Sequence, residues 1–346
     1  MDWKRHVVPA EVGIYNCNEL AYSLMLSILQ HLLIKCFLFV LAIASKTTSG
    51  SLTSGALNLH RHNHGGTCFP AERAALLSFK KSITEDSAGQ LSSWHGRDCC
   101  LWRGVTCSNQ TGHVLKLQLR NPYQDVFGPD GCSYEDGLSG EISPSLLSLE
   151  HLEHLDLSMN CWLVGPRHSF PEFLAYMKNL KYLNLTGLSF ISRVPPQLGN
   201  LSRLQHLELG SAYGPTFMQS SDITWLSNLH FLKSLRMSGV NLSGIADWPH
   251  TLNMIPSLSV IRLPFCSLDS ASQSIADFNL TNLEILDLSA NVFDHSIASA
   301  WFWKATSLKY INLSLNNFYG LLHDALENMT FLKVLDLSKN RNTIIT

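Results

Sequence analysis

The stretch that decides the fold reads Leu152-Glu-His-Leu155-Asp-Leu157-Ser-Met-Asn160. In a short β-strand, Leu155 and Leu157 point to one side, whereas the residue between them faces solvent. One such strand cannot bury its own leucines, so the pattern predicts neighbouring copies that share a core. The rest of the chain therefore has to be searched for the same frame.

The frame recurs nine times, at steps of 24 to 38 residues. Its middle apolar residues are Leu117, Leu155, Leu183, Leu207, Leu235, Ile261, Leu286, Ile311 and Leu335. This is the pattern of a leucine-rich repeat. It predicts an α/β fold in which the repeats stack into a solenoid, a horseshoe or superhelix, with a parallel sheet on the concave side.

The residue that closes each motif is expected to satisfy backbone groups of the turn shared with the next repeat. Asn fills this position at Asn160, Asn291, Asn316 and Asn340. Cys266 replaces it in the sixth repeat, which predicts a buried, unpaired thiol there. Leu188, Ala212 and Val240 interrupt the series in repeats three to five, where we expect local distortion.

Composition excludes several classes of protein. The chain has 346 residues, 25 Lys and Arg against 27 Asp and Glu, and only 15% charged residues. It is therefore neither a polybasic nucleic-acid binder nor a disordered polyelectrolyte. Acidic residues such as Asp156, Asp287 and Asp336 recur at one repeat position, as a repeat consensus requires, so they do not indicate a catalytic pair. We expect no enzyme, no cofactor and no metal site.

The N-terminal region has the layout of a secretory signal. The only uninterrupted apolar run, Cys36 to Ala44, is too short to span a bilayer and ends in a small-x-small triplet, so residues 1–44 are predicted to be removed. An uncleaved signal anchor is the alternative, and Met25 is a second possible start. Residues 45–67 form a polar linker, and Pro70 to Ile83 has the spacing of a short amphipathic helix.

A secretory route implies disulfides and N-glycans. Seven cysteines follow the leader, an odd number, and the sequence alone does not fix their pairing. Glycosylation sequons begin at Asn109, Asn184, Asn200, Asn241, Asn279, Asn312 and Asn328.

The segment from Trp94 to Cys107 resembles the N-terminal cap of plant extracellular leucine-rich-repeat proteins, and Leu138-Ser-Gly140-Glu-Ile142 resembles their second short strand. Further runs at 70–79, 140–147 and 221–226 are most similar to plant receptor-like proteins of the fungal-xylanase-receptor type. The resemblance implies a disulfide-bonded cap over 68–112 and about nine repeats over 113–346. Family members carry more repeats, one membrane span and a short cytoplasmic tail, so we expect the chain to be C-terminally truncated.

The cap cysteines have a predicted pairing. Adjacent Cys99 and Cys100 would form only a strained bridge with each other, so we predict Cys68–Cys99 and Cys100–Cys107. By elimination, Cys132 is expected to pair with Cys161.

Variable residues between the leucines of the concave strands are the candidate ligand-binding positions. They are Glu153, His154, Asp156, Lys181, Tyr182, Gln205, His206, Glu208, Lys233, Arg236, Arg262, Phe265, Lys309 and Tyr310. The resemblance implies the ectodomain of a plasma-membrane receptor for defence or development, which binds a pathogen or self protein, peptide or glycan and signals through a partner kinase. The alternative is a secreted, apoplastic inhibitor of microbial wall-degrading enzymes, similar to polygalacturonase inhibitors. The ligand itself cannot be identified from the sequence.

Overall fold

The structure is a computed structural model. It describes residues 68–121, 137–210, 218–269, 275–322, 326–341 and 343–344. The expected leader, the linker and Cys132 lie outside the described residues. No described helix is long and apolar enough to cross a membrane.

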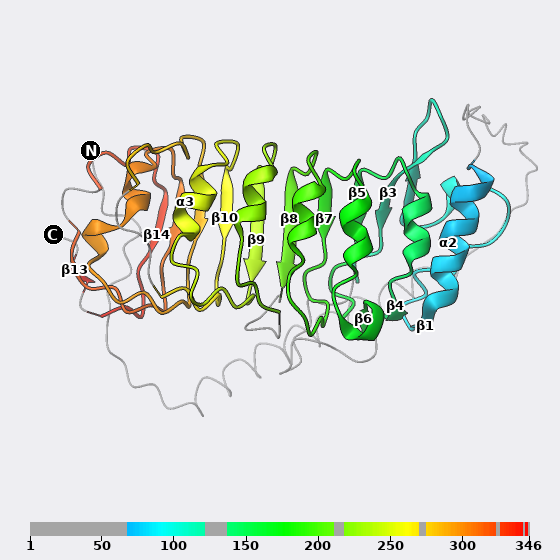
Figure 1. Cartoon of the computed structure of the whole chain (residues 1–346), viewed down its shortest axis with the longest axis horizontal. Helices are drawn as coiled ribbons and strands as arrows, with labels where there is room; N and C mark the ends of the chain where they lie inside the picture. The colour runs from blue at the N-terminus through cyan, green and yellow to red at the C-terminus, as the bar shows by residue number, and fades with distance from the viewer. Residues whose placement is uncertain are drawn as a thin grey trace, which may run out of the picture. The chain divides into compact units, whose positions relative to one another are not determined.

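A parallel sheet of repeat strands forms the body of the chain. Its nine strands are β3 (Val114–Gln118), β5 (His154–Asp156), β7 (Tyr182–Asn184), β8 (His206–Gly210), β9 (Ser234–Ser238), β10 (Val260–Arg262), β11 (Ile285–Asp287), β12 (Tyr310–Asn312) and β14 (Val334–Asp336). β2 (Val105–Cys107) adds a tenth, antiparallel strand at the β3 end. In Figure 1 the strands stand side by side along the long axis, with the helices on the near side.

The register of this sheet confirms the predicted frame. Each middle apolar residue is the partner of the next one along the sheet, from Leu117 opposite Leu155 to Ile311 opposite Leu335. Leu155 and Leu157 are fully buried, as are the equivalent leucines of most repeats. Each buried leucine stabilises the fold by about 1.5 to 3 kcal/mol, so the stacked array holds its own core.

Short helices and second strands complete the outer side of the repeats. The helices are η2 (Pro144–Ser148), η3 (Pro166–His168), η4 (Glu172–Tyr176), η5 (Pro196–Asn200), η6 (Thr224–Asn228), α3 (Trp248–Asn253), η7 (Ile297–Ser299) and η8 (Trp301–Lys304). The second strands β4 (Leu138–Glu141) and β6 (Leu163–Val164) pair with each other, as do β13 (Gly320–Leu321) and β15 (Thr343–Ile344). The predicted plant-type second strand is therefore present at Leu138, and β13 is a further second strand at Gly320.

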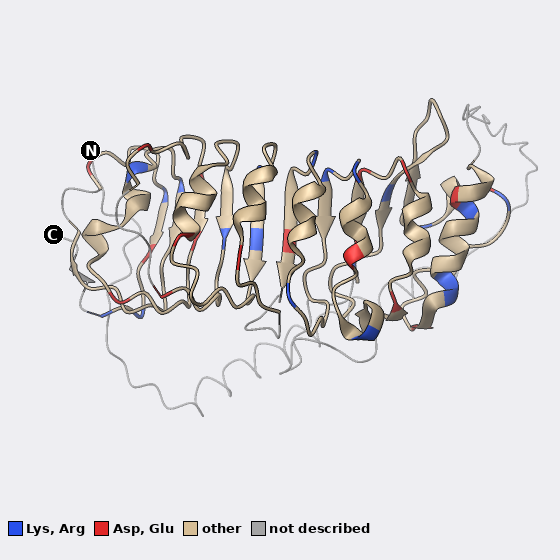
Figure 2. Cartoon of the chain, in the orientation of Figure 1, with Lys and Arg blue, Asp and Glu red and all other residues tan. Residues whose placement is uncertain are grey.

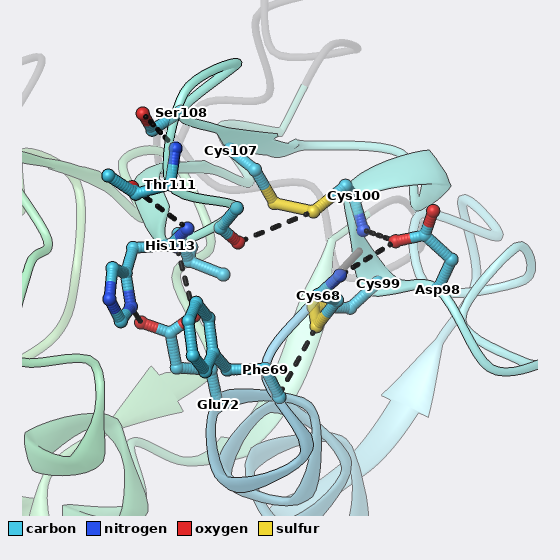
Figure 3. Close-up of a disulfide and its surroundings, with 12 residues drawn as sticks. Cys68, Phe69, Glu72, Asp98, Cys99, Cys100, Cys107, Ser108, Thr111 and His113 are labelled. Atoms are coloured by element: carbon cyan, nitrogen blue, oxygen red, sulfur yellow. Dashed lines mark hydrogen bonds and ion pairs between the residues drawn. A yellow bond between two sulfur atoms is a disulfide. The ribbon is translucent and has the colours of Figure 1, made fainter. Parts of the chain in front are cut away.

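The N-terminal cap is built around two disulfides. α2 (Pro70–Ser82) buries Leu76 and Phe79 against the first repeats, and is followed by β1 (Ile83–Asp86), η1 (Cys99–Leu101) and β2. The structure joins Cys68 to Cys99 and Cys100 to Cys107, the expected pairing. Figure 3 shows Asp98 beside both bridges, where its Oδ1 accepts hydrogen bonds from the backbone N of Cys68 at 3.3 Å and of Cys100 at 3.0 Å.

Glu72 fastens the cap to the first repeat strand. Its carboxylate is 4% exposed, accepts a hydrogen bond from the backbone N of Val114 at 3.0 Å, and lies 3.1 Å from Nδ1 of His113. The ring of His113 stacks on Phe69 with 3.9 Å between centroids (Figure 3). These contacts close the N-terminal end of the sheet, where an uncovered strand would otherwise expose its core.

Asparagine side chains tie consecutive repeats together, as predicted. Nδ2 of Asn160 donates to the carbonyls of Leu119 and Leu157, both at 2.8 Å, and its Oδ1 accepts from the backbone N of Leu138 at 2.9 Å. Asn291, Asn316 and Asn340 repeat this arrangement. One side chain therefore satisfies backbone groups of two repeats that water cannot reach.

Ala212 lies outside the described residues, and in the repeat sheet itself the local distortion expected in repeats three to five is wrong. β8 and β9 pair in register over five residues, from His206 to Gly210. The backbone bonds between repeats are kept: the N–H of Gly187 donates to the carbonyl of Gly210 at 2.7 Å and that of Gly239 to Pro264 at 2.8 Å, as Ala290 donates to Ser314 at 2.9 Å in a repeat that has its asparagine. Leu188 and Val240 are buried at the interrupted positions, so a hydrophobic contact supplies part of the cohesion there.

The remaining cysteines also have defined states where the structure describes them. Cys161 is disulfide-bonded. Cys266 is a free, fully buried thiol, as predicted.

Candidate ligand-binding surface

The solvent-facing side of the repeat sheet, here called the sheet face, presents side chains in straight columns. Parallel strands in register place equivalent residues next to each other at a spacing of about 4.8 Å. The first column, one residue before the middle leucine, is Lys116, His154, Tyr182, His206, Ser234, Val260, Ile285, Tyr310 and Val334. The second column, one residue after it, is Gln118, Asp156, Asn184, Glu208, Arg236, Arg262, Asp287, Asn312 and Asp336.

Three rings of the first column form a ladder, which we call the ring ladder: His154, Tyr182 and His206. The rings of His154 and Tyr182 stack at 4.1 Å with 7° between their planes, and His206 follows at 5.7 Å from Tyr182. Parallel strands bring the rings together from three different repeats. The ladder therefore has a fixed spacing that does not depend on loop conformation.

Burial favours the neutral form of both ladder histidines. Burial lowers the pKa of His154 to about 4, with Lys116 and His206 adding to the effect and Asp156 opposing it. Burial also lowers the pKa of His206, although Glu208 opposes this. Burial raises the pKa of Tyr182. The ring of His154 is therefore uncharged at mildly acid pH, and its buried Nε2 has no hydrogen-bond partner among the described residues.

Ion pairs join neighbouring repeats along the sheet face. Lys181 contacts Glu153 at 2.8 Å, Arg236 contacts Glu208 at 3.8 Å and Lys309 contacts Glu284 at 2.7 Å. In Figure 2 the acidic position of β8 lies next to basic positions on β9 and β10. Each pair is at least partly exposed and adds about 0 to 1 kcal/mol to stability.

Thirteen of the fourteen predicted positions lie in the strands of the sheet face or directly before them. Phe265 does not: it lies in the turn after β10 with φ of 58°, and its backbone N donates to the carbonyl of Ser289. Its side chain is 38% exposed, but it lies beyond the end of β10 and in neither column of the sheet face. Asp156 is only 5% exposed and accepts two hydrogen bonds from Ser158, so it stabilises the turn.

The predicted positions did not include Lys116 or the apolar members of the first column, Val260, Ile285 and Val334. Their signal was present, because each occupies the repeat position of His154 and Tyr182. Valine and isoleucine are also ordinary strand residues, however, so polarity alone did not separate them from the core.

The sequons differ in accessibility. Asn109, Asn200, Asn241, Asn279 and Asn328 are exposed. Asn184 is 4% exposed, and its Nδ2 donates to Tyr182 at 3.2 Å and to Glu208 at 3.4 Å. The folded chain leaves no room for a glycan on that nitrogen, so Asn184 does not fit the expected glycosylation. Asn312 is half-buried on the same column.

One group of three metal-ligand side chains comes together in the part of the chain that the structure describes: Cys68, Cys99 and Cys100. All three sulfurs are already in disulfides. The cluster is a consequence of the cap and not a metal centre.

The comparisons with known proteins agree with this architecture. Residues 69–108 match the family model described as "Leucine rich repeat N-terminal domain". The chain is 36% identical over 281 residues to receptor-like protein EIX1 of Solanum lycopersicum, covering 79% of this chain and 26% of the relative. Receptor-like protein EIX2 of the same species is 34% identical over 278 residues, with the same shares. The chain thus spans about a quarter of the length of these curated relatives.

Solved structures show the same fold. The Arabidopsis receptor kinase HAESA, in complex with the peptide hormone IDA and the co-receptor SERK1, is 26% identical with a TM-score of 0.59, covering 79% of this chain and 46% of that chain. A plant ice-binding protein also has a TM-score of 0.59, at 22% identity, covering 81% of this chain and 90% of that chain. At that identity the second likeness concerns the fold alone.

Proposed function

Because the cap and repeats of this chain belong to the leucine-rich-repeat receptor-like proteins of plants, we propose that the chain binds an extracellular ligand as part of a cell-surface receptor ectodomain. The sheet face is the binding surface. The observation that carries this proposal is the sheet face itself, where a core of Leu, Ile and Met lies beneath columns of chemically varied side chains. Varied side chains on a regular strand surface are typical of solenoids that bind ligands.

The redox state supports an extracellular location. Two cap disulfides and a fifth bonded cysteine, Cys161, suit the oxidising secretory pathway and not the cytosol. We further propose that the receptor acts in defence or development together with a partner kinase. HAESA, which shares the fold, was solved with a peptide hormone and a co-receptor, and this precedent supports the proposal for the present chain.

Binding is proposed in preference to catalysis, because the relatives are receptor-like proteins. A secreted inhibitor of wall-degrading enzymes would use the same surface in a different way. The two functions are separated by what happens to the bound enzyme: an inhibitor lowers its activity, whereas a receptor needs only to hold it.

A binding experiment tests the proposal. The secreted glycoprotein is immobilised, and a purified fungal xylanase and a purified fungal polygalacturonase serve as probes, with the activity of each enzyme measured in parallel. Three proteins are compared: the natural chain, a sheet-face variant with Tyr182→Ser and Arg236→Ser, and an outer-side control with Tyr176→Ser, whose ring is 62% exposed at the end of η4.

The proposal expects binding of a probe that is lost in the sheet-face variant, retained in the control and accompanied by unchanged enzyme activity. Binding with loss of activity would support the inhibitor. Binding that the sheet-face variant leaves intact would overturn the sheet face as the ligand surface.

A further inference from the structure

A small second sheet joins the N-terminal cap to the first repeats and is separate from the repeat sheet. It consists of β1, β4 and β6, with β4 in the middle. Figure 1 shows these three strands together at the cap end of the solenoid. Leu138 of β4 and Leu163 of β6 are fully buried, so the residues that alternate with them face solvent. No residue of this solvent side belongs to either column of the sheet face.

The solvent side of the second sheet carries an open hollow of about 860 Å³, here called the cap hollow. Its volume lies within the range of about 300 to 1,000 Å³ that is usual for small-molecule sites. Gly140 lines it with φ of 133°, at a point where a Cβ would clash with the carbonyl of Ser82 and lie 2.9 Å from Cα of Ile83. Only glycine fits where β1 crosses β4 so closely, so no side chain fills the hollow at this position.

Three side chains form a row across the cap hollow. Glu85 of β1 is the partner of Ser139 of β4. Gly140 pairs in parallel with Leu163, so Trp162, directly before β6, stands beside Ser139. Strands about 4.8 Å apart place the backbones of Glu85 and Trp162 about 10 Å from each other. The row thus offers a carboxylate, a hydroxyl and an indole ring, in that order.

The backbone of Trp162 is fixed on both sides. Its neighbour Cys161 is buried and disulfide-bonded, and the carbonyl of Trp162 accepts a hydrogen bond from the backbone N of Gly140 at 3.0 Å. The side chain nevertheless remains 43% exposed and lines the hollow. An indole with a fixed backbone and an open ring is a surface on which a flat ligand can stack.

The charged groups of the cap hollow are all acidic. Glu85 and Glu141 line it, and no Lys or Arg stands among the described residues that do so. The ion pairs found in the described ranges of the chain engage neither carboxylate. An ionised carboxylate only accepts hydrogen bonds, whereas the hydroxyls of Ser139 and Thr84 both donate and accept. A ligand for this hollow must therefore carry hydrogen-bond donors and no negative charge.

We propose that the cap hollow binds a neutral oligosaccharide, with one sugar ring stacked on the indole of Trp162. A pyranose ring has a face of C–H groups and a rim of hydroxyls. The C–H face suits the apolar indole, and the hydroxyls donate to the carboxylates of Glu85 and Glu141. This second site lies apart from the sheet face, so the inference goes beyond the proposed function and does not depend on it.

Other occupants fit the lining of the hollow less well. Phosphate, sulfate or uronic acid groups would meet two carboxylates and no cation, which is repulsive. A lipid or an apolar helix would need more apolar surface than Trp162 and Val164 supply. A protonated polyamine satisfies the carboxylates but has no acceptor for the hydroxyls of Ser139 and Thr84. A polyamine is therefore the competing ligand in the test.

Isothermal titration calorimetry on the complete secreted chain tests the proposal. The probes are cellohexaose and mannohexaose, which are neutral, with hexagalacturonate as the acidic control and spermidine as the organic cation. At least one neutral hexaose should bind at millimolar concentration, and hexagalacturonate and spermidine should bind at least about tenfold more weakly. Thermal melting of every variant confirms that it is folded.

Substitutions locate the binding. Trp162→Ala should weaken the hexaose by about tenfold or more, because it removes the stacking surface, and Trp162→Phe should restore most of the affinity. Glu85→Gln keeps the shape but replaces a charged acceptor with a neutral one, so we expect a loss of about fivefold. The matched control is Tyr176→Ala, which removes another exposed ring on the outer side and should leave the affinity within about twofold.

The outcomes separate this inference from the proposed function. Absence of hexaose binding, or equal binding by folded Trp162→Ala, overturns the cap hollow as a sugar site. Spermidine binding that is lost in Glu85→Gln, without hexaose binding, overturns it in favour of an organic-cation site. If the sheet-face variant with Tyr182→Ser and Arg236→Ser loses the hexaose while Trp162→Ala keeps it, the cap hollow is wrong and the sheet face still stands. Hexaose binding that only the Trp162 and Glu85 variants weaken supports the cap hollow, whatever the sheet-face variant does to xylanase binding.

Discussion

Oδ1 of Asn291 accepts a hydrogen bond from the backbone N of Cys266 at 3.0 Å. This bond joins the asparagine that closes one repeat motif to the cysteine that takes the same position one repeat earlier. The thiol of Cys266 in turn donates to the carbonyl of Met237 at 2.9 Å. That carbonyl is equivalent to Leu263, to which Nδ2 of Asn291 donates at 2.8 Å. The sulfur therefore performs one of the two carbonyl contacts that the amide performs elsewhere.

Replacement of Cys266 by Asn should change the free energy of unfolding by less than about 1 kcal/mol, because the Asn amide can donate to the carbonyl of Met237 as the thiol does. Replacement by Leu should cost about 1 to 3 kcal/mol, since the buried carbonyl of Met237 loses one of its two donors and keeps only the N–H of Val240, at 3.3 Å. Urea denaturation of both variants measures the difference. Burial raises the pKa of this thiol to about 12, so iodoacetamide should not label it in the native protein. Rapid labelling without unfolding would contradict the buried position.

Removal of a repeat-closing asparagine side chain should lower the free energy of unfolding in proportion to the hydrogen bonds that the side chain makes. Asn291→Ala leaves the carbonyl of Leu263 and the N–H groups of Cys266 and Leu268 without partners, so we expect a loss of about 2 to 4 kcal/mol. Asn282→Ala is the matched control, because Asn282 makes one exposed hydrogen bond to the carbonyl of Pro256. It should cost less than about 1 kcal/mol. Equal losses of unfolding free energy in the two variants would show that the repeat-closing asparagines do not stabilise the packing of one repeat on the next.

The neutral His154 makes stability depend on pH. Its pKa is about 4 in the folded chain and 6.5 in the unfolded chain, so the unfolded state binds more protons between these values. Stability should therefore fall as the pH is lowered from 6.5 towards 4, by about 1 to 2 kcal/mol after allowance for partial exposure. Thermal melting of the natural chain and of His154→Gln across this range measures the effect. A His154→Gln variant with the same pH slope as the natural chain would rule it out.

The cap disulfides should contribute unequally. Cys68 and Cys99 are 31 residues apart and Cys100 and Cys107 are 7 apart. On the chain-entropy estimate, the longer loop should contribute about 3 to 4 kcal/mol and the shorter about 2 to 3 kcal/mol. Paired replacements by Ser, one bridge at a time, test this by denaturation. Peptide mapping without reduction gives the pairing itself, and a Cys68–Cys107 peptide would disprove it.

Glycan occupancy should follow exposure. Asn200, Asn279 and Asn328 should carry glycans in the secreted protein, and Asn184 should not, because its Nδ2 is buried in contacts with Tyr182 and Glu208. Deglycosylation in heavy-oxygen water followed by mass spectrometry marks each occupied asparagine. A native, correctly melting protein with a glycan on Asn184 would mean that β7 is placed wrongly.

The fold was more predictable from the sequence than the binding surface. The leucine spacing fixes which residues are buried, and the middle residues from Leu117 to Leu335 are in the expected register because a shift by one would expose every leucine. Asn184 shows the limit, since its burial depends on Tyr182 in its own strand and Glu208 in the next repeat. Phe265 was misplaced because a left-handed backbone at a non-glycine residue has no reliable sequence signal.

In-register pairing of the repeat strands also converts repeat number into length. Equivalent residues of neighbouring repeats are direct partners in the sheet. Insertion or loss of one whole repeat therefore moves every later repeat by one strand spacing, about 4.8 Å, and leaves the pairing within the other repeats unchanged. The distance from the ring ladder to Arg262 is therefore set by the number of repeats that lie between them, and one added repeat would lengthen it by one strand spacing.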